Sequence, residues 1–107
     1  MALAHLQQLG YRILHTNWRY GRDEIDIVAR QGDVVVMVEV KTRATDFFGD
    51  PEAFITAGQQ NRIVRAADAY LIAHEMDLET RFDVIGIVLN QYQQKLEHIE
   101  HAFVPGP

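Results

Sequence analysis

Residues 23–41, DEIDIVARQGDVVVMVEVK, decide the fold of this chain, because two apolar runs here flank a short polar segment. The runs at about 24–30 and 33–42 predict two β-strands, and residues 30–33 between them contain a glycine that suits a tight turn. Charged side chains are rarely buried in strands this apolar unless they are paired or bind a metal. The acids and the lysine of this predicted hairpin therefore indicate a functional site.

Counting along the two strands places the charged side chains of the hairpin on one face of the sheet. Side chains alternate between faces along a strand, so Glu39 and Lys41 project to the same side. If residues 30–33 form the turn, Glu24 lies opposite Glu39, and Asp26 becomes a diagonal neighbour of Glu39 with Cβ atoms about 7–8 Å away. That separation suits two carboxylates that converge on one cation. A turn with an odd number of residues would separate the two sets of side chains.

The chemistry of this cluster follows from its charges. Crowded carboxylates repel each other unless one is protonated or a cation joins them. All-oxygen ligands suit Mg²⁺ or Mn²⁺, so Asp26, Glu39 and Glu24 are the expected metal ligands. Such an ion activates water and holds a phosphate oxygen, and Lys41 would neutralise charge that develops on the phosphate. Phosphodiester hydrolysis uses all of these parts, with Asp26, Glu39 and Lys41 as the catalytic residues, although a solvated strand face with an ordinary ion pair stays open.

The same residues resemble a known nuclease signature. Asp26 followed by Glu39-Val40-Lys41 is similar to the PD-(D/E)xK motif. More narrowly, the chain resembles the bacterial YraN-like family, which is related in pattern to archaeal Holliday junction resolvases. The segments that carry this narrower resemblance are Gly10-Tyr11-Arg12-Ile13-Leu14, Asn17-Trp18-Arg19, Glu24-Ile25-Asp26, Val38-Glu39-Val40-Lys41-Thr42-Arg43 and Arg81-Phe82-Asp83-Val84.

The resemblance implies an α/β protein with a restriction-endonuclease-like core, in which helices flank a mixed β-sheet of about five strands. It also implies Mg²⁺ or Mn²⁺ as the cofactor and DNA, including branched DNA, as the partner. A symmetric four-way junction would call for a homodimer, because two phosphodiester bonds must be cut.

Two positions depart from the pattern of these relatives. Related proteins carry a Gly-Glu pair in the first helix, and that glutamate is a further metal-site acid in the resolvases. This chain has no acidic residue before Asp23, and it has Gln59 where the family tends to place a lysine. Residues 2–9 also read as a helix without an N-cap residue, so the chain is expected to begin inside a helix, as a truncated protein would. An alternative therefore stays open, namely a nuclease-fold module that binds nucleic acid or protein without efficient catalysis.

Length and composition describe one domain of 107 residues with a single core. The chain contains no cysteine and no apolar run near 18 residues, which predicts a cytoplasmic protein without disulfides or a membrane segment. The net charge of −5 weighs against nucleic-acid binding, but residues 1–66 hold eight basic and eight acidic side chains, so the excess lies in residues 67–107. The basic residues expected to contact nucleic acid are Arg43, Arg19, Arg22 and Arg62.

The remaining sequence predicts the element order α-β-β-β-α-β-β. The expected elements after the hairpin are a loop at 43–52, a helix at about 52–75, an interior strand at 82–89 and an edge strand at 92–103. A first helix at 2–9 and a strand at 11–18 precede the hairpin. Phe47 and Phe48 are expected to leave at least one ring exposed in a mobile, DNA-gripping loop, while burial of one ring stays open. His98 is expected on a solvated edge.

Overall fold

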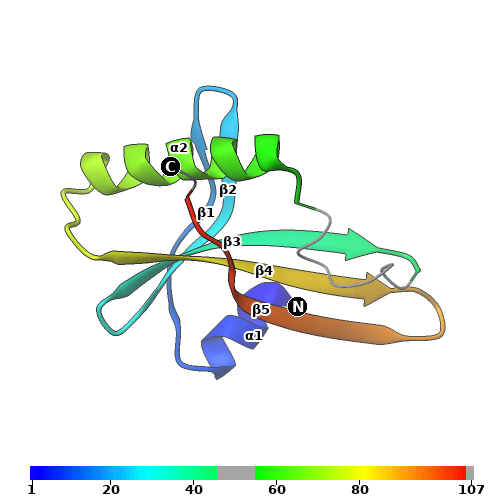
Figure 1. Cartoon of the computed structure of the whole chain (residues 1–107). Coiled ribbons are helices and arrows are strands. Elements are labelled where there is room, and N and C mark those ends of the chain that lie inside the picture. Colours follow the sequence, from blue (N-terminus) through cyan, green and yellow to red (C-terminus); the bar gives the residue numbers. More distant parts are fainter. Residues whose placement is uncertain (46–54, 106–107) are drawn as a thin grey trace.

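The computed structural model describes residues 1–45 and 55–105 of the chain, and its ribbon is drawn in Figure 1. Within these ranges, five strands form one sheet, with a short helix on one face and a long helix on the other. The element order matches the predicted α-β-β-β-α-β-β. The elements are α1 (Ala2–Gln8), β1 (Arg12–Tyr20), β2 (Asp23–Gln31), β3 (Val34–Arg43), α2 (Ala57–Ala73), β4 (Glu79–Leu89) and β5 (Gln94–Phe103).

The strands lie in the sheet in the order in which they occur in the chain. All neighbouring pairs are antiparallel except β3 and β4, which run parallel. Parallel neighbours need a crossover connection, and the segment that contains α2 provides it. The sheet is therefore mixed, as predicted. Among residues 1–45 and 55–105, no helix is long and apolar enough to cross a membrane.

The turn between β2 and β3 is shorter than the four residues expected from the sequence. Gln31 pairs with Val34, so only Gly32 and Asp33 form the turn, and Gly32 takes a positive φ of 58°. Tight two-residue turns favour glycine for this reason. The correction moves Met37 opposite Val28, instead of Asp26. Because the predicted and observed turns both have an even number of residues, the side chains of the paired residues, Ile27–Gln31 and Val34–Val38, keep their relative faces.

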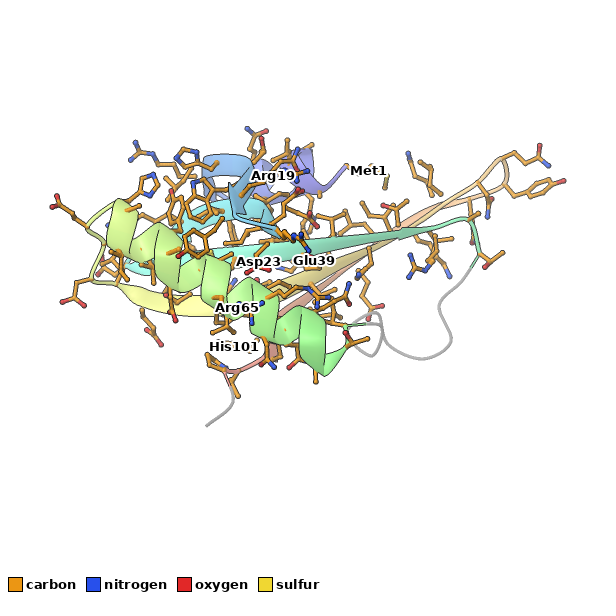
Figure 2. The ribbon with its side chains drawn as sticks, turned by 90° about the horizontal axis from the view of Figure 1, so that it is seen from above. Met1, Arg19, Asp23, Glu39, Arg65 and His101 are labelled. Carbon is orange, nitrogen blue, oxygen red and sulfur yellow. The ribbon has the colours of Figure 1, made fainter. Side chains whose placement is uncertain are left out.

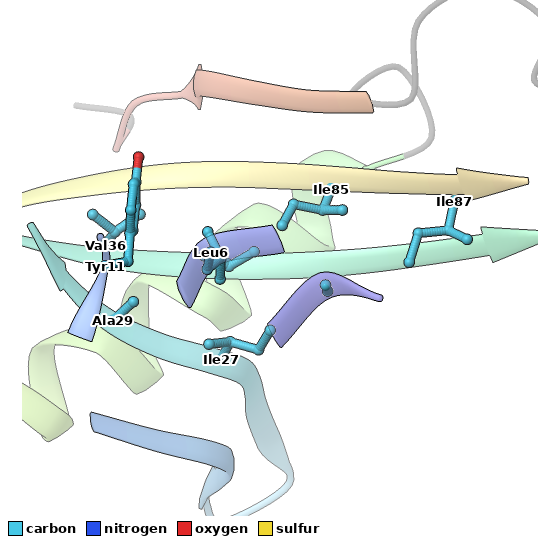
Figure 3. Packing of buried hydrophobic residues seen from close by; sticks show 9 residues of the cluster. Leu6, Tyr11, Ile27, Ala29, Val36, Ile85 and Ile87 are labelled. Carbon is cyan, nitrogen blue, oxygen red and sulfur yellow. The ribbon is translucent and has the colours of Figure 1, made fainter. Parts of the chain in front are cut away.

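Two hydrophobic clusters cover the two faces of the sheet. Even-numbered residues of β3, such as Val36, pack toward α1, and Figure 3 shows Leu6 of α1 over the strands among Ile27, Val36 and Ile85. Odd-numbered residues of β3, such as Met37, pack toward α2. This alternation explains why β3 is apolar on both faces, and it assigns Glu39 and Lys41 to the α2 side.

The helix α2 begins with a complete capping box. The Thr56 hydroxyl accepts a hydrogen bond from the Gln59 backbone N–H, and the Gln59 side chain accepts one from the Thr56 N–H. Gly58 lies in the first turn and does not break the helix. The helix spans Ala57–Ala73, which is shorter than the predicted range of about 52–75. The strand β3 continues to Arg43, so the expected loop starts later than predicted. Most of that loop, with Phe47 and Phe48, lies outside the described residues.

Candidate active site

The two charged residues near the end of β3 form an ion pair on the face that α2 covers. Lys41 Nζ lies 3.5 Å from Glu39 Oε1, and the two side chains are only 13% and 16% exposed. This arrangement is the one expected from strand alternation. The sequence alone also allowed an ordinary ion pair on a solvated strand face. This glutamate and lysine differ from such a pair because both side chains are largely withdrawn from water.

Asp26 reaches the same place from the neighbouring strand. Its Oδ2 accepts a hydrogen bond of 2.8 Å from the backbone N–H of Val40, between Glu39 and Lys41. The recorded pairing of β2 with β3 ends at Ile27 and Val38, so Asp26 lies just beyond the last pair. Ile25 packs toward α2 and Ile27 toward α1, so β2 changes face around Asp26. Asp26 is near enough to Glu39 to raise the pKa of the Glu39 carboxyl, so the two carboxylates lie together, as predicted from the hairpin.

The carboxyl of Glu39 has a strongly raised pKa. Burial raises the pKa of its carboxyl, the neighbouring Asp26 raises it further, and Lys41 only partly opposes these effects, so the pKa reaches about 7. A carboxyl that holds its proton near neutral pH lacks a sufficient positive partner. A further cation bound beside Glu39 would therefore be electrostatically favourable.

Beside Glu39 lies a small open pocket of about 90 Å³, between the β1–β2 turn, β3 and the first half of α2. Figure 2 shows Asp23 and Glu39 close together near α2. Asp26 and Lys41 do not line this pocket, although both interact with Glu39, which does. The lining residues are Arg22, Asp23, Glu24, Glu39, Gln59, Arg62 and Ile63.

The arginines around the pocket fall into two groups. Arg19 holds Glu24 at 2.8 Å, and Arg65 of α2 holds Asp23 at 3.2 Å, so these two arginines already have partners. Arg22 and Arg62 are exposed at the pocket and form no ion pair with any residue that the structure describes. They are the two predicted nucleic-acid contacts that line the pocket.

The structure also places three other acidic or basic residues relative to the predicted site. Glu24 is close to Glu39, as expected, but its carboxylate is engaged by Arg19. Asp23 was not predicted as a site residue, and its pairing with Arg65 depends on a helix too distant in sequence to be anticipated. The predicted contact Arg43 is exposed at the end of β3, where it donates a hydrogen bond to the Thr42 carbonyl.

The carboxylate pair suits a hard divalent ion better than a soft one. Within residues 1–45 and 55–105, no three histidine, aspartate or glutamate side chains come together closely enough to hold a metal ion. Mg²⁺ needs fewer, since it is commonly held by one or two carboxylates while keeping several waters. Asp26 and Glu39 meet that requirement, and the raised pKa of Glu39 shows that the pair lacks positive charge.

A second polar cluster lies on the opposite face of the sheet, beneath α1. Asp83 is fully buried and receives two hydrogen bonds of 2.8 Å from Arg81 and one of 2.8 Å from His98 Nε2. The other ring nitrogen of His98 lies 3.0 Å from His5 of α1. The expectation of a solvated edge for His98 was therefore wrong, because the sequence does not reveal that Asp83 and α1 cover this part of β5.

The acids of the two clusters behave in opposite ways. Burial alone would raise the pKa of Asp83, but the hydrogen bonds from His98 and Arg81 lower it below its ordinary value. The Arg81 pKa is raised, chiefly by its hydrogen bonds to Asp83. The buried charges of this cluster are thus mutually satisfied. We assign them a structural role that ties α1, β4 and β5 together.

The fold and the acidic site define an α/β protein with a mixed sheet that is compatible with a restriction-endonuclease-like core. The comparison with protein families then gives the family. This chain belongs to Uncharacterised protein family UPF0102, the YraN family, whose model matches residues 1–87. The resemblance inferred from the sequence motifs is thereby confirmed.

Curated relatives support the same assignment over nearly the whole chain. A UPF0102 protein of Flavobacterium psychrophilum is 41% identical over 103 residues, which are 96% of this chain and 87% of the relative. Another, of Bacteroides thetaiotaomicron, is 42% identical over 104 residues, 97% of this chain and 86% of the relative. One of Geobacter sulfurreducens is 45% identical over 105 residues, with coverages of 96% and 82%.

Proposed function

We propose that this protein is a metal-dependent endonuclease that uses Mg²⁺ or Mn²⁺ to hydrolyse phosphodiester bonds in DNA, including branched DNA. The observation that carries the proposal is the partly buried set of Asp26, Glu39 and Lys41 beside a pocket that Arg22 and Arg62 line. Acids that lack positive charge lie here with guanidinium groups that have no acidic partner among residues 1–45 and 55–105. A divalent cation and a phosphate would satisfy both groups at once.

Asp26 and Glu39 would hold the metal ion. The Val40 N–H binds one oxygen of Asp26 and holds this carboxylate beside Glu39. Glu24 lines the same pocket and would join as a third ligand only by giving up its bond to Arg19. The bound ion would activate a water molecule and polarise a phosphate oxygen.

The basic residues would act on the phosphate. Lys41, held beside Glu39, would stabilise the negative charge that builds on the phosphate in the transition state. Arg22 and Arg62 would bind the phosphates of the substrate and place one of them against the carboxylate pair.

A nicking assay on plasmid and junction DNA in Mn²⁺ tests this proposal. We expect wild-type protein to cleave, and Asp26→Ala, Glu39→Gln and Lys41→Ala each to lose at least about 100-fold in rate, the scale at which a single charge-stabilising group contributes. The matched control is Asp33→Asn, because Asp33 is an acid on the β2–β3 turn with a side chain 96% exposed. Equal activity in all of these preparations would reject the site.

A second candidate is a nuclease-fold module that binds nucleic acid or protein without efficient catalysis. It is favoured by the engagement of Glu24 with Arg19, since this removes an acid from the metal set. Calorimetry with Mn²⁺ separates the two. Binding that Glu39→Gln abolishes supports the enzyme, whereas absence of binding at millimolar Mn²⁺ supports the module.

A further inference from the structure

The turn between β1 and β2 exposes an aromatic ring next to the pocket. Tyr20 is the last residue of β1, and it is 55% exposed. The turn itself consists of Gly21 and Arg22, so Tyr20 pairs directly with Asp23, the first residue of β2. Both Arg22 and Asp23 line the pocket. Tyr20 is therefore the immediate cross-strand neighbour of the pocket wall.

The pairing also determines the side to which Tyr20 projects. Directly opposed residues of an antiparallel pair share a face. Asp23 faces α2, where it pairs with Arg65, and Trp18 shares that face, since its ring meets Tyr70 of α2 edge-on at 5.1 Å. Tyr20 thus continues a row that α2 covers at Trp18 and leaves open beyond it.

The charges near this ring distinguish it from an ordinary exposed tyrosine. Arg22 follows it after one glycine, lines the pocket and has no acidic partner among the residues described, whereas the preceding Arg19 is paired with Glu24. Basic side chains that follow a backbone, together with an aromatic face on which a base stacks, are the combination that binds single-stranded nucleic acid. A base within a continuous duplex has both faces covered by its neighbours, so only an unpaired base can stack on the ring.

We infer that Tyr20 is a stacking site for an unpaired nucleobase of the strand whose phosphate enters the pocket. This inference rests on the proposed function and names its substrate class, DNA that is single-stranded beside the cleaved bond. Arg22 would hold the adjoining phosphate, and Tyr20 would hold the base, so the two contacts fix the strand relative to Asp26 and Glu39.

The chain supplies its own matched control for this site. Tyr92 is 87% exposed and also lies at a strand-to-strand turn, between β4 and β5. Its neighbours in sequence are glutamines, and it does not line the pocket. A contribution from exposed tyrosines in general would appear equally at Tyr92, whereas a contribution from this particular site would appear at Tyr20 alone.

The test is fluorescence anisotropy with a labelled oligodeoxythymidine about 16 nucleotides long and a duplex of equal length. Both are titrated with the full chain in EDTA, so that no metal-dependent cleavage occurs. We expect Tyr20→Ala to weaken single-strand binding roughly 5- to 100-fold, the range that loss of one stacked base produces, and to change duplex binding less than about twofold. Tyr20→Phe, which keeps the ring, and Tyr92→Ala should both stay within about twofold of wild type on both ligands.

Four results would overturn the inference. They are no measurable binding of the single strand by wild type, normal single-strand binding by Tyr20→Ala, an equal loss for single strand and duplex in Tyr20→Ala, and a loss in Tyr20→Phe as large as in Tyr20→Ala. Because the measurement needs no catalysis, it separates the two ideas. A chain that cleaves nothing but shows the expected pattern keeps the base site and loses the nuclease proposal. If the wild-type chain cleaves DNA but Tyr20→Ala binds the single strand normally, the nuclease proposal stands and the base site is rejected.

Discussion

Replacement of Glu39 by glutamine should stabilise the metal-free protein at alkaline pH. Burial and the neighbouring Asp26 raise the Glu39 pKa from 4.5 to about 7, so the unfolded chain ionises this group while the folded chain still holds the proton. Between these two pH values, wild type loses stability as the pH rises, because the folded state binds more protons. The loss is complete above pH 7 and corresponds to about 3 kcal/mol as an upper limit. Glutamine keeps the shape and cannot ionise, so the variant escapes this loss.

Urea unfolding in EDTA, followed at pH 4.5 and pH 8, checks this prediction. The free energy of unfolding of Glu39→Gln minus that of wild type should be more positive at pH 8 than at pH 4.5, by up to about 3 kcal/mol. Asp33→Asn, which changes a fully solvated acid, should show no such difference. Mn²⁺ should stabilise wild type at pH 8 and leave Glu39→Gln unchanged. A variant destabilised by the same amount at both pH values would refute the reasoning, since Glu39 would then be satisfied by its neighbours in the ionised form.

The other predictions concern the buried ion pair, the helix cap and the basic residues. Asp83→Asn leaves Arg81 without its buried partner and should cost about 3 kcal/mol in urea unfolding at neutral pH. Since the Asp83 pKa is lowered, this contribution should vanish as the pH falls below 3.8, and a difference that persists there would contradict the pairing. Thr56→Ala should lower the free energy of unfolding by about 1 kcal/mol and Thr56→Ser by much less, because serine keeps the capping hydroxyl. Equal losses in the two variants would disprove the role of the cap. Arg22→Ala and Arg62→Ala should each lower the salt dependence of DNA binding by about one phosphate contact, whereas an unchanged slope would exclude them from the interface.

The faces of the central hairpin could be predicted from the sequence because they depend only on alternation along a strand. The turn was misjudged by two residues, since both four residues and Gly32-Asp33 alone are compatible with a glycine-containing turn. An even-numbered error moves partners along the strand and leaves the side chains of the paired residues, Ile27–Gln31 and Val34–Val38, on their own faces. Glu39 and Lys41 therefore remained together. Asp26 lies beyond the last recorded pair, Ile27 with Val38, and its hydrogen bond from the Val40 N–H could not be predicted from alternation.

Contacts between distant segments could not be predicted in this way. The engagement of Asp23 by Arg65 requires knowledge of how α2 crosses the β1–β2 hairpin, and that of His5 with His98 requires the position of α1 beneath β5. These pairs join residues far apart in sequence, and periodicity within one element does not describe how two elements pack. The same reason explains why His98 looked like a residue of a solvated edge.

The contrast between the two withdrawn acids gives a physical reason for placing the active site at Glu39. Asp83 and Glu39 are both withdrawn from water. Asp83 accepts two hydrogen bonds from Arg81 and one from His98, and its pKa is lowered. Glu39 has one lysine at 3.5 Å and an acid as its other neighbour, and its pKa rises. Folding alone favours the first arrangement, because it satisfies the buried charge. The second lowers stability above neutral pH, a cost that a bound cation would remove, and perturbed groups of this kind concentrate at functional sites.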